Sequence, residues 1–321
     1  MRILYFGTYD REHPRNVNAI AALRAAGVEV VERHLQLGRG GVLGTLELLL
    51  AEARLALPGR RNADAVIVGY PGHFDVPRAR RLAGRRPLVF DAVLSLEDEL
   101  VSVRQQYGPR SAAAAVLRVT DARAFRLPDL VVCGTEAEAA YLRELGADRT
   151  AVVFLGADED VFREGWTPTY PFSALHEADG SSDVVGEAAA LVPEVPVRSI
   201  RRADLDPDDV GLAFARAGIV LGSFRESRSI PAGVFGALAT GAPVITADTS
   251  AARELLEDGV TALLVPPEHP HALAKAITLL AGDDALRESV AEAGHRVFVE
   301  RAAREVRGRQ WRALVEDQLA Q

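Results

Sequence analysis

The sequence is poor in cysteine, lysine and long apolar runs, and each shortage narrows what the protein can be. Cys133 is the only cysteine, so no disulfide can form within the chain, which fits a reducing compartment. Lys275 is the only lysine, and arginine supplies the other cationic side chains. The longest apolar candidate, 42–57, carries charged residues and is too short to cross a bilayer. The chain opens directly into a strand-like segment without a signal peptide, so we expect a cytoplasmic protein with no transmembrane segment.

The sequence is also short of positive charge overall, with a net charge of −8. This balance argues against a nucleic-acid partner, for which a basic footprint is expected. A P-loop, zinc-ligand spacings and a nucleophilic triad are absent, and only Gly7 follows the first strand where a dinucleotide fingerprint needs three glycines. These absences exclude a dehydrogenase and predict a protein without a metal or a bound cofactor.

Short apolar segments alternate with helical patterns along all 321 residues, of which 48% are hydrophobic and 26% charged. That length and composition suit two soluble globular domains. Because the strands are buried runs rather than alternating ones, they predict parallel sheets of an α/β protein. The candidate strands are 2–7, 28–32, 63–68, 88–91, 129–133, 151–155, 219–224, 243–247 and 262–265.

The segment 217–248 organises the second half of the chain, as a strand, a polar loop, a helix, a tight turn and a strand. Pro231 suits the first position of a helix, and Gly241 suits its end. Arg225 and Arg228 lie in the loop before that helix. A loop between a parallel strand and a helix start favours anions, because free N–H groups and the helix dipole attract negative charge.

The helix ends in Ala237-Leu238-Ala239-Thr240-Gly241-Ala242-Pro243-Val244, which resembles the donor-sugar segment of GT-B glycosyltransferases of family 4. The segment 129–162 is similar to the part of that family that enters the interdomain linker. The resemblance implies two Rossmann-like domains with parallel sheets facing across a cleft, the second domain being reduced. The implied divisions are 1–160 for the acceptor domain, 161–300 for the donor domain, and 301–321 for a helix crossing back.

The sequence departs from the family at its charged positions. Gly236 stands where relatives carry a helix glutamate, and Arg228 stands where they carry a loop acid. Asp91 occupies the neighbourhood of a histidine that lies near the reacting sugar carbon in many relatives. Between 164 and 196 there is no arginine or lysine to hold a diphosphate, and His176 is the only residue there that could become cationic. The nearest replacements are Arg198, Arg201 and Arg202.

The function that the resemblance implies is transfer of a sugar, with retention, from a nucleoside diphosphate donor to a small-molecule or glycan acceptor. Leaving-group stabilisation then matters more than a strong base. The expected donor-binding residues are Gly7, Thr8, Arg198, Arg225, Glu226, Arg228, Ser229, Ile230 and Pro231. The expected catalytic residues are Asp91, His73 and Glu226, and the expected acceptor-binding residues are Arg15, Asn16, His73 and Ser95. The nucleotide sugar acts as a co-substrate.

A second interpretation stays open. The missing glutamate, histidine and diphosphate cations also fit a protein that keeps the architecture but no longer catalyses, or that uses the cleft for another reaction. Such a protein would act as a binding or regulatory partner, and a homo-oligomer or protein partner fits either interpretation. Each polar candidate also has an ordinary structural explanation, as a solvated loop charge or as part of a first strand-helix turn.

Overall fold

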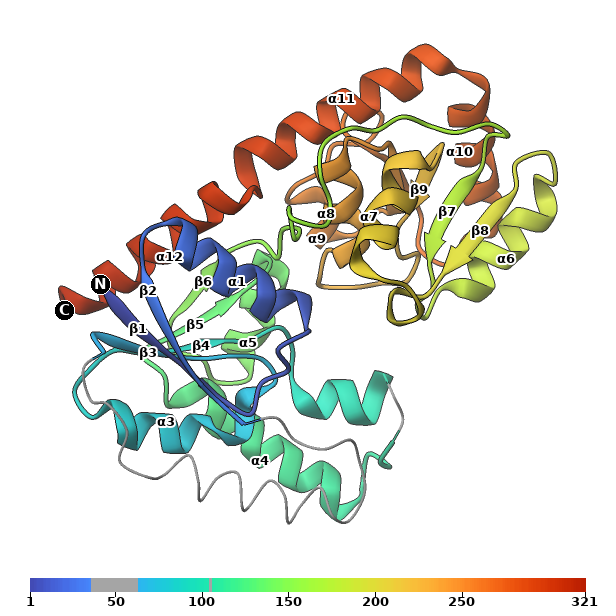
Figure 1. The fold of residues 1–321 in the computed structure, drawn as a ribbon. Helices are drawn as coiled ribbons and strands as arrows, with labels where there is room; N and C mark the ends of the chain where they lie inside the picture. The colour runs from blue at the N-terminus through green and yellow to red at the C-terminus, as the bar shows by residue number, and fades with distance from the viewer. Residues whose placement is uncertain (36–62, 104–105) are drawn as a thin grey trace. The chain divides into compact units, whose positions relative to one another are not determined.

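The computed structural model describes residues 1–35, 63–103 and 106–321, and the helix expected over 42–57 lies outside them (Figure 1). Contacts divide the chain into an N-terminal unit, Met1–Val153 with Arg307–Gln321, and a C-terminal unit, Phe154–Val306. Within the described ranges, no helix is both long and apolar enough to span a bilayer.

The N-terminal unit is built on a six-stranded sheet in the order β2-β1-β3-β4-β5-β6. Every neighbouring pair is parallel. β1, β3, β4 and β5 are almost wholly buried, as their apolar sequences require of a sheet covered on both faces. The strands are β1 (Arg2–Gly7), β2 (Glu29–His34), β3 (Ala65–Val68), β4 (Leu88–Asp91), β5 (Leu130–Cys133) and β6 (Thr150–Val152).

Helices cover both faces of this sheet (Figure 1). One apolar core joins the sheet to α3 (Val76–Ala83), α4 (Ala112–Arg126) and α5 (Glu136–Glu144). A second core joins it to α1 (Pro14–Ala25) and to α12 (Arg304–Leu319), through Trp311 and Val315. Two short helical turns, η1 (Gly72–Phe74) and η2 (Asp98–Val103), follow the carboxyl ends of β3 and β4.

The C-terminal unit has a five-stranded parallel sheet in the order β11-β10-β9-β7-β8. The segment between 164 and 196 that lacks arginine and lysine still forms a strand and a helix, β7 and α6. The strands are β7 (Ala174–Glu177), β8 (Val197–Ile200), β9 (Ile219–Leu221), β10 (Val244–Ala247) and β11 (Leu263–Val265).

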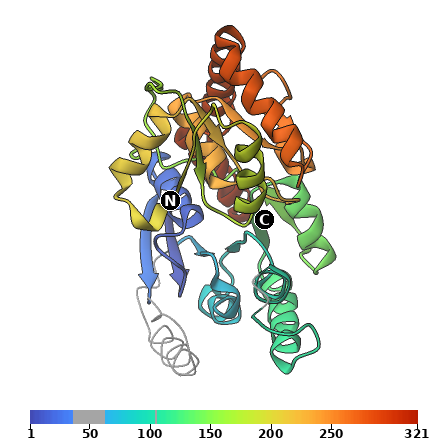
Figure 2. The same ribbon diagram turned by 90° about the vertical axis from the view of Figure 1, so that its right-hand side faces the viewer.

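Helices surround the second sheet as they do the first (Figure 2). An apolar core joins α6 (Ser182–Leu191) and α10 (Pro270–Gly282) to strands β7, β9, β10 and β11. α8 (Ala232–Thr240) contacts β9 and β10, and it packs against α7 (Pro207–Arg216) and α11 (Asp284–Arg301). The short elements are η3 (Arg202–Asp204) and α9 (Ser250–Arg253). The predicted parallel α/β architecture of both halves is confirmed.

Each sheet reverses its strand order at one point. In the first sheet, β2 lies on one side of β1, and β3 and the later strands lie on the other. In the second sheet, β8 lies on one side of β7, and β9 and the later strands lie on the other. The carboxyl ends of the strands beside such a reversal border the crevice where open α/β sheets bind ligands. These edges position the candidate site residues.

Candidate functional site

The loop after β9 forms a small hollow with the end of β10 and with α9, at the carboxyl edge of the C-terminal sheet. Gly222 is the first residue of this loop. A Cβ at this position would lie 2.6 Å from Oγ1 of Thr246 in β10, so only a glycine allows the backbone after β9 to lie this close to β10. The hollow encloses about 10 Å³, about the room of one water molecule. Its lining is Ser223, Arg225, Ser227, Ser229, Ile230, Pro231, Thr246, Ala247, Thr249 and Ala252.

Four predicted donor-binding residues therefore meet in one place: Arg225, Ser229, Ile230 and Pro231. Pro231 is the N-cap residue of α8 and makes no side-chain capping hydrogen bond, and a helix start of this kind attracts negative charge. Glu226 and Arg228 belong to the same loop and are exposed, but neither lines the hollow.

Arg225 bridges the two loops that flank the reversal point. Its Nε donates to the carbonyl of Gly180, in the loop after β7, and its guanidinium lies 3.8 Å from the carboxylate of Asp183 at the start of α6. Half of the Arg225 side chain is exposed. In this arrangement the guanidinium is held by protein groups, and it remains within reach of solvent.

A second arginine reaches the same edge from η3, which follows β8. Arg202 makes a bidentate pair with Glu177, the last residue of β7, at 2.8 and 2.9 Å. Its guanidinium also lies 5.2 Å from the ring centroid of Phe162. The Glu177 carboxylate lies against the first turn of α8, since a Cβ on Gly233 would be 3.0 Å from its Oε2. The sequence indicates Arg202 only as a nearby cation, because residue spacing does not show which arginine turns toward β7.

The other cations proposed for this region lie elsewhere. Arg198 is level with Leu175 in the sheet, two residues before the carboxyl end of β7, so it does not join the edge that Arg202 reaches. Arg201 is mostly exposed and pairs with Asp204 at 2.8 Å. His176 is fully buried, and burial lowers its pKa below the ordinary value, so the ring is neutral at pH 7 and supplies no charge.

Gly236, at the position where the resemblance implied a helix glutamate, lies against an aromatic ring. A Cβ at this position of α8 would lie 2.7 Å from a ring carbon of Phe162. The aromatic ring therefore fills the space that a glutamate side chain would need. Phe162 itself packs edge-on against Phe214, with ring centroids 5.0 Å apart.

In the N-terminal unit, the loop after β1 is folded around an internal carboxylate. Gly7 has φ of 131°, and a Cβ there would come within 2.6 Å of Oδ2 of Asp75. The backbone N–H and the hydroxyl of Thr8 both donate to that oxygen, at 2.7 and 3.0 Å. Asp75, which was not among the predicted site residues, thus accepts the hydrogen bonds of Thr8, a residue that was expected to bind the donor. Its position just before a proline-containing helix start was the only sequence signal.

Arg15, Asn16 and Asp91 form a buried polar network beside this loop. Arg15 Nε donates to Oδ1 of Asp91 at 2.7 Å, and its Nη1 donates to the carbonyl of Val153. The hydroxyl of Tyr5 donates to Asn16 at 3.0 Å, and Asn16 donates in turn to backbone carbonyls. Burial raises the pKa of Asp91 to about 6, against the opposing effect of Arg15.

His73 and Ser95 are buried as well. His73 Nε2 lies 3.0 Å from the carbonyl of Leu94, and the ring packs edge-on against Phe90 and Phe125. Burial lowers the pKa of His73 to about 4. Ser95 donates to Oδ2 of Asp121 at 2.9 Å, within a set of bonds that fixes the turn after β4.

Five of the predicted site residues are buried. Exposed fractions of 3% or less leave these side chains no surface for an acceptor or a reacting sugar. Their partners are protein groups, so in this structure they support the carboxyl edge of the sheet rather than form its surface. The residues are Arg15, Asn16, His73, Asp91 and Ser95. Within the described part of the chain, no group of three or more His, Cys, Asp or Glu residues could hold a metal ion.

Two parallel-sheet units of this kind define the GT-B fold of glycosyltransferases. Similar solved structures include HepE of Anabaena in complex with UDP and glucose, at TM-score 0.68 and 17% identity, covering 98% of this chain and 99% of that one. Sucrose-phosphate synthase from Thermosynechococcus elongatus is similar at TM-score 0.70 and 16% identity, covering 99% of both chains. At these identities the similarity establishes the fold.

The family comparison concerns the C-terminal unit. Residues 173–313, less than half of the chain, match the family described as glycosyl transferase-like. An exopolysaccharide phosphotransferase from Streptomyces coelicolor is 33% identical over 102 residues, which is 32% of this chain. The chain spans only 11% of the length of that relative.

Proposed function

We propose that the protein transfers a sugar, with retention, from a nucleoside diphosphate sugar to a small-molecule or glycan acceptor. The observation that carries this proposal is the meeting of Arg225, Arg202 and the open start of α8 at the reversal point of the C-terminal sheet. Two guanidinium groups and a helix N-terminus suit a departing diphosphate. HepE of Anabaena, a structural neighbour, was solved with UDP-glucose, which supports a nucleotide sugar as donor.

The proposed reaction breaks the bond between the sugar C1 and the diphosphate oxygen, and it forms a bond from C1 to an acceptor hydroxyl oxygen. The acceptor proton passes to the leaving diphosphate. Arg225 and Arg202 stabilise the charge that develops on the diphosphate. Because the hollow encloses only about 10 Å³, the diphosphate would lie at its mouth. There it would replace Gly180 as the acceptor for Arg225 and Glu177 as the acceptor for Arg202.

Calorimetric titration with UDP, GDP and ADP tests the donor site. Arg225→Gln and Arg202→Gln should each weaken binding of the preferred diphosphate by about 10-fold, because each removes a charge-assisted hydrogen bond. Arg201→Gln is the matched control, since Arg201 is next in sequence but pairs outward with Asp204. Equal affinity in all three variants and the wild type would place the diphosphate elsewhere and overturn the assignment.

A second candidate function is supported by the internal carboxylates. Asp75 accepts hydrogen bonds from Thr8, and Glu177 accepts them from Arg202. At the carboxyl edge of each sheet, these donors therefore have an acceptor within the protein and need no ligand. A protein of this kind would be a non-catalytic binding or regulatory partner. Tight binding of a diphosphate without sugar release or transfer, measured across a set of nucleotide sugars, would favour this function over the transferase.

A further inference from the structure

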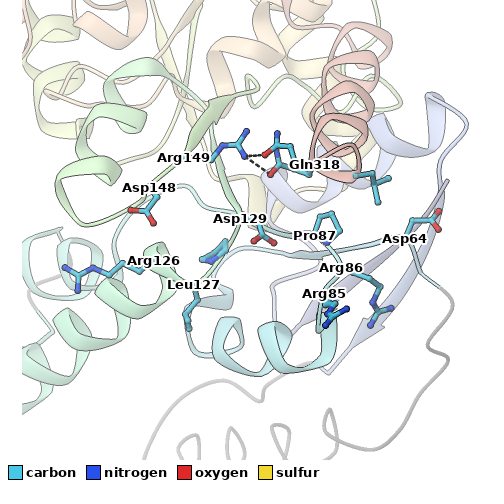
Figure 3. Close-up of a pocket in the computed structure, with 13 residues that line it drawn as sticks. Asp64, Arg85, Arg86, Pro87, Arg126, Leu127, Asp129, Asp148, Arg149 and Gln318 are labelled. Atoms are coloured by element: carbon cyan, nitrogen blue, oxygen red, sulfur yellow. Dashed lines mark hydrogen bonds between the residues drawn. The ribbon is translucent and has the colours of Figure 1, made fainter.

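A separate cavity of about 640 Å³ opens at the other edge of the N-terminal sheet (Figure 3). Its lining comes from the residues just before β3, β4, β5 and β6, together with the end of α12. In a parallel sheet these strand starts share one edge, opposite the carboxyl edge that holds Thr8 and Asp75. The lining residues are Asp64, Arg85, Arg86, Pro87, Arg126, Leu127, Pro128, Asp129, Asp148, Arg149, Gln318, Leu319 and Gln321.

Two arginines of this cavity have no acceptor among the residues that the structure describes. Neither Arg85 nor Arg126 makes a hydrogen bond or an ion pair with any residue that the structure describes, and both are exposed. Arg149 donates to the side-chain oxygens of Gln318, in the last turn of α12, and of Gln321, just after that helix. An arginine without a partner retains its full capacity for phosphate or carboxylate.

The acidic groups of the cavity are largely engaged. Asp129 pairs with Arg80 at 2.7 Å and also accepts the N–H of Leu88. Asp64 accepts the N–H of Arg2 at 2.7 Å. Asp148 is exposed and is the one carboxylate of the lining for which the described residues provide no partner. The lining therefore offers free positive charge at two positions against one free negative charge.

The free arginines are separated by apolar side chains. In Figure 3, Arg126 lies at one side of the cavity and Arg85 at another, with Leu127 between them in this view and Pro87 on the same side as Arg85. Leu319 and Pro128 add further apolar surface to the lining. A volume of 640 Å³ falls within the range of small-molecule sites, which combine an apolar surface with a few polar groups.

We propose that this cavity binds an organic bisphosphate, in which an apolar spacer separates two phosphate groups. One phosphate contacts Arg85, the other contacts Arg126, and the spacer covers Leu127 and Pro87. The site is distinct from the proposed donor site, because the donor site lies in the C-terminal unit and at the carboxyl edge of its own sheet.

Calorimetric titration with a series of alkane-α,ω-diyl bisphosphates of increasing chain length tests the proposal. One length should bind best, and the matching alkyl monophosphate should bind about 10-fold more weakly, because it loses one charge-assisted contact. Arg85→Gln and Arg126→Gln should each reduce bisphosphate affinity by about the same factor. Both side chains are exposed and make no hydrogen bond or ion pair with a described residue, so these variants should fold as the wild type does.

Matched controls come from the same two helical regions. Arg81→Gln in α3 and Arg123→Gln in α4 remove the same charge from exposed positions outside the cavity, and they should leave affinity unchanged. Arg225→Gln should also leave it unchanged. The proposal is overturned by the absence of saturable binding, by an equal loss in the control variants, or by a loss confined to Arg225→Gln, which would place the bisphosphate in the donor site.

Discussion

Asp75 and Glu177 each place a carboxylate where a phosphate was expected. Asp75 accepts two donors from Thr8, and Glu177 holds both nitrogens of the Arg202 fork while lying against the first turn of α8. An anionic ligand at either position must compete with an anion that is already part of the chain. The strength of that competition is therefore a property of single residues and can be measured by neutralising them.

Glu177→Gln should tighten binding of the preferred nucleoside diphosphate about fivefold, because a partly exposed ion pair with Arg202 is worth about 1 kcal/mol to break. The measurement is a calorimetric titration of wild type and variant at equal ionic strength. Glu187→Gln, which removes the same charge from an exposed position on α6, is the control. Weaker binding by Glu177→Gln would mean that the carboxylate positions Arg202 for the ligand instead of competing with it.

His73 should make stability depend on pH. Burial lowers its pKa from 6.5 to about 4, so the unfolded chain binds a proton between these values while the folded chain does not. Stability is thus complete above the unfolded pKa and falls as the pH drops toward 4. Between about pH 7.5 and about pH 5 the loss from this residue should be about 2 kcal/mol.

Urea unfolding at both pH values checks this expectation. His73→Gln should be less stable at neutral pH, since it loses packing against Phe90 and Phe125, but its stability should fall less on acidification than that of the wild type. Comparing the pH-dependent differences cancels the contribution of Asp91 and other groups. Parallel losses in wild type and variant would show that His73 does not titrate in this way.

At the scale of elements, the contact between α8 and Phe162 limits which side chains α8 can carry at position 236. Gly236→Ala should destabilise the protein by about 1–2 kcal/mol, because the added methyl must displace an aromatic ring packed in the core. Gly186→Ala in α6 is the matched control: nothing lies within 4 Å of its Cβ, so it should stabilise by about 0.5–1 kcal/mol. Urea unfolding of both variants measures the difference, and a Gly236→Ala protein as stable as the wild type would contradict the steric explanation.

At the scale of the whole molecule, the proposed chemistry relies on arginine for positive charge. Sugar transfer or donor hydrolysis should therefore proceed at an unchanged rate in excess EDTA, because Arg202 and Arg225 are proposed to stabilise the diphosphate. The measurement is release of nucleoside diphosphate with and without the chelator. Activity that disappears in EDTA and returns with Mg²⁺ would show that a metal ion stabilises the diphosphate instead of the two arginines. The control reaction is the same assay with Arg225→Gln, which should be slow under both conditions.

The sequence by itself determined the alternation of strands and helices, the parallel sheets, and the loop that brings Arg225, Ser229 and Pro231 together. These features depend on the spacing of apolar residues and on turn chemistry within short segments, which are visible in the chain. Only the tertiary structure decided that Arg15 pairs with Asp91, that Asp75 accepts from Thr8, and that Arg202 rather than Arg198 reaches β7. Such pairings join residues about 25 to 76 positions apart in sequence, and whether a polar side chain faces a ligand or a partner depends on what the fold places beside it.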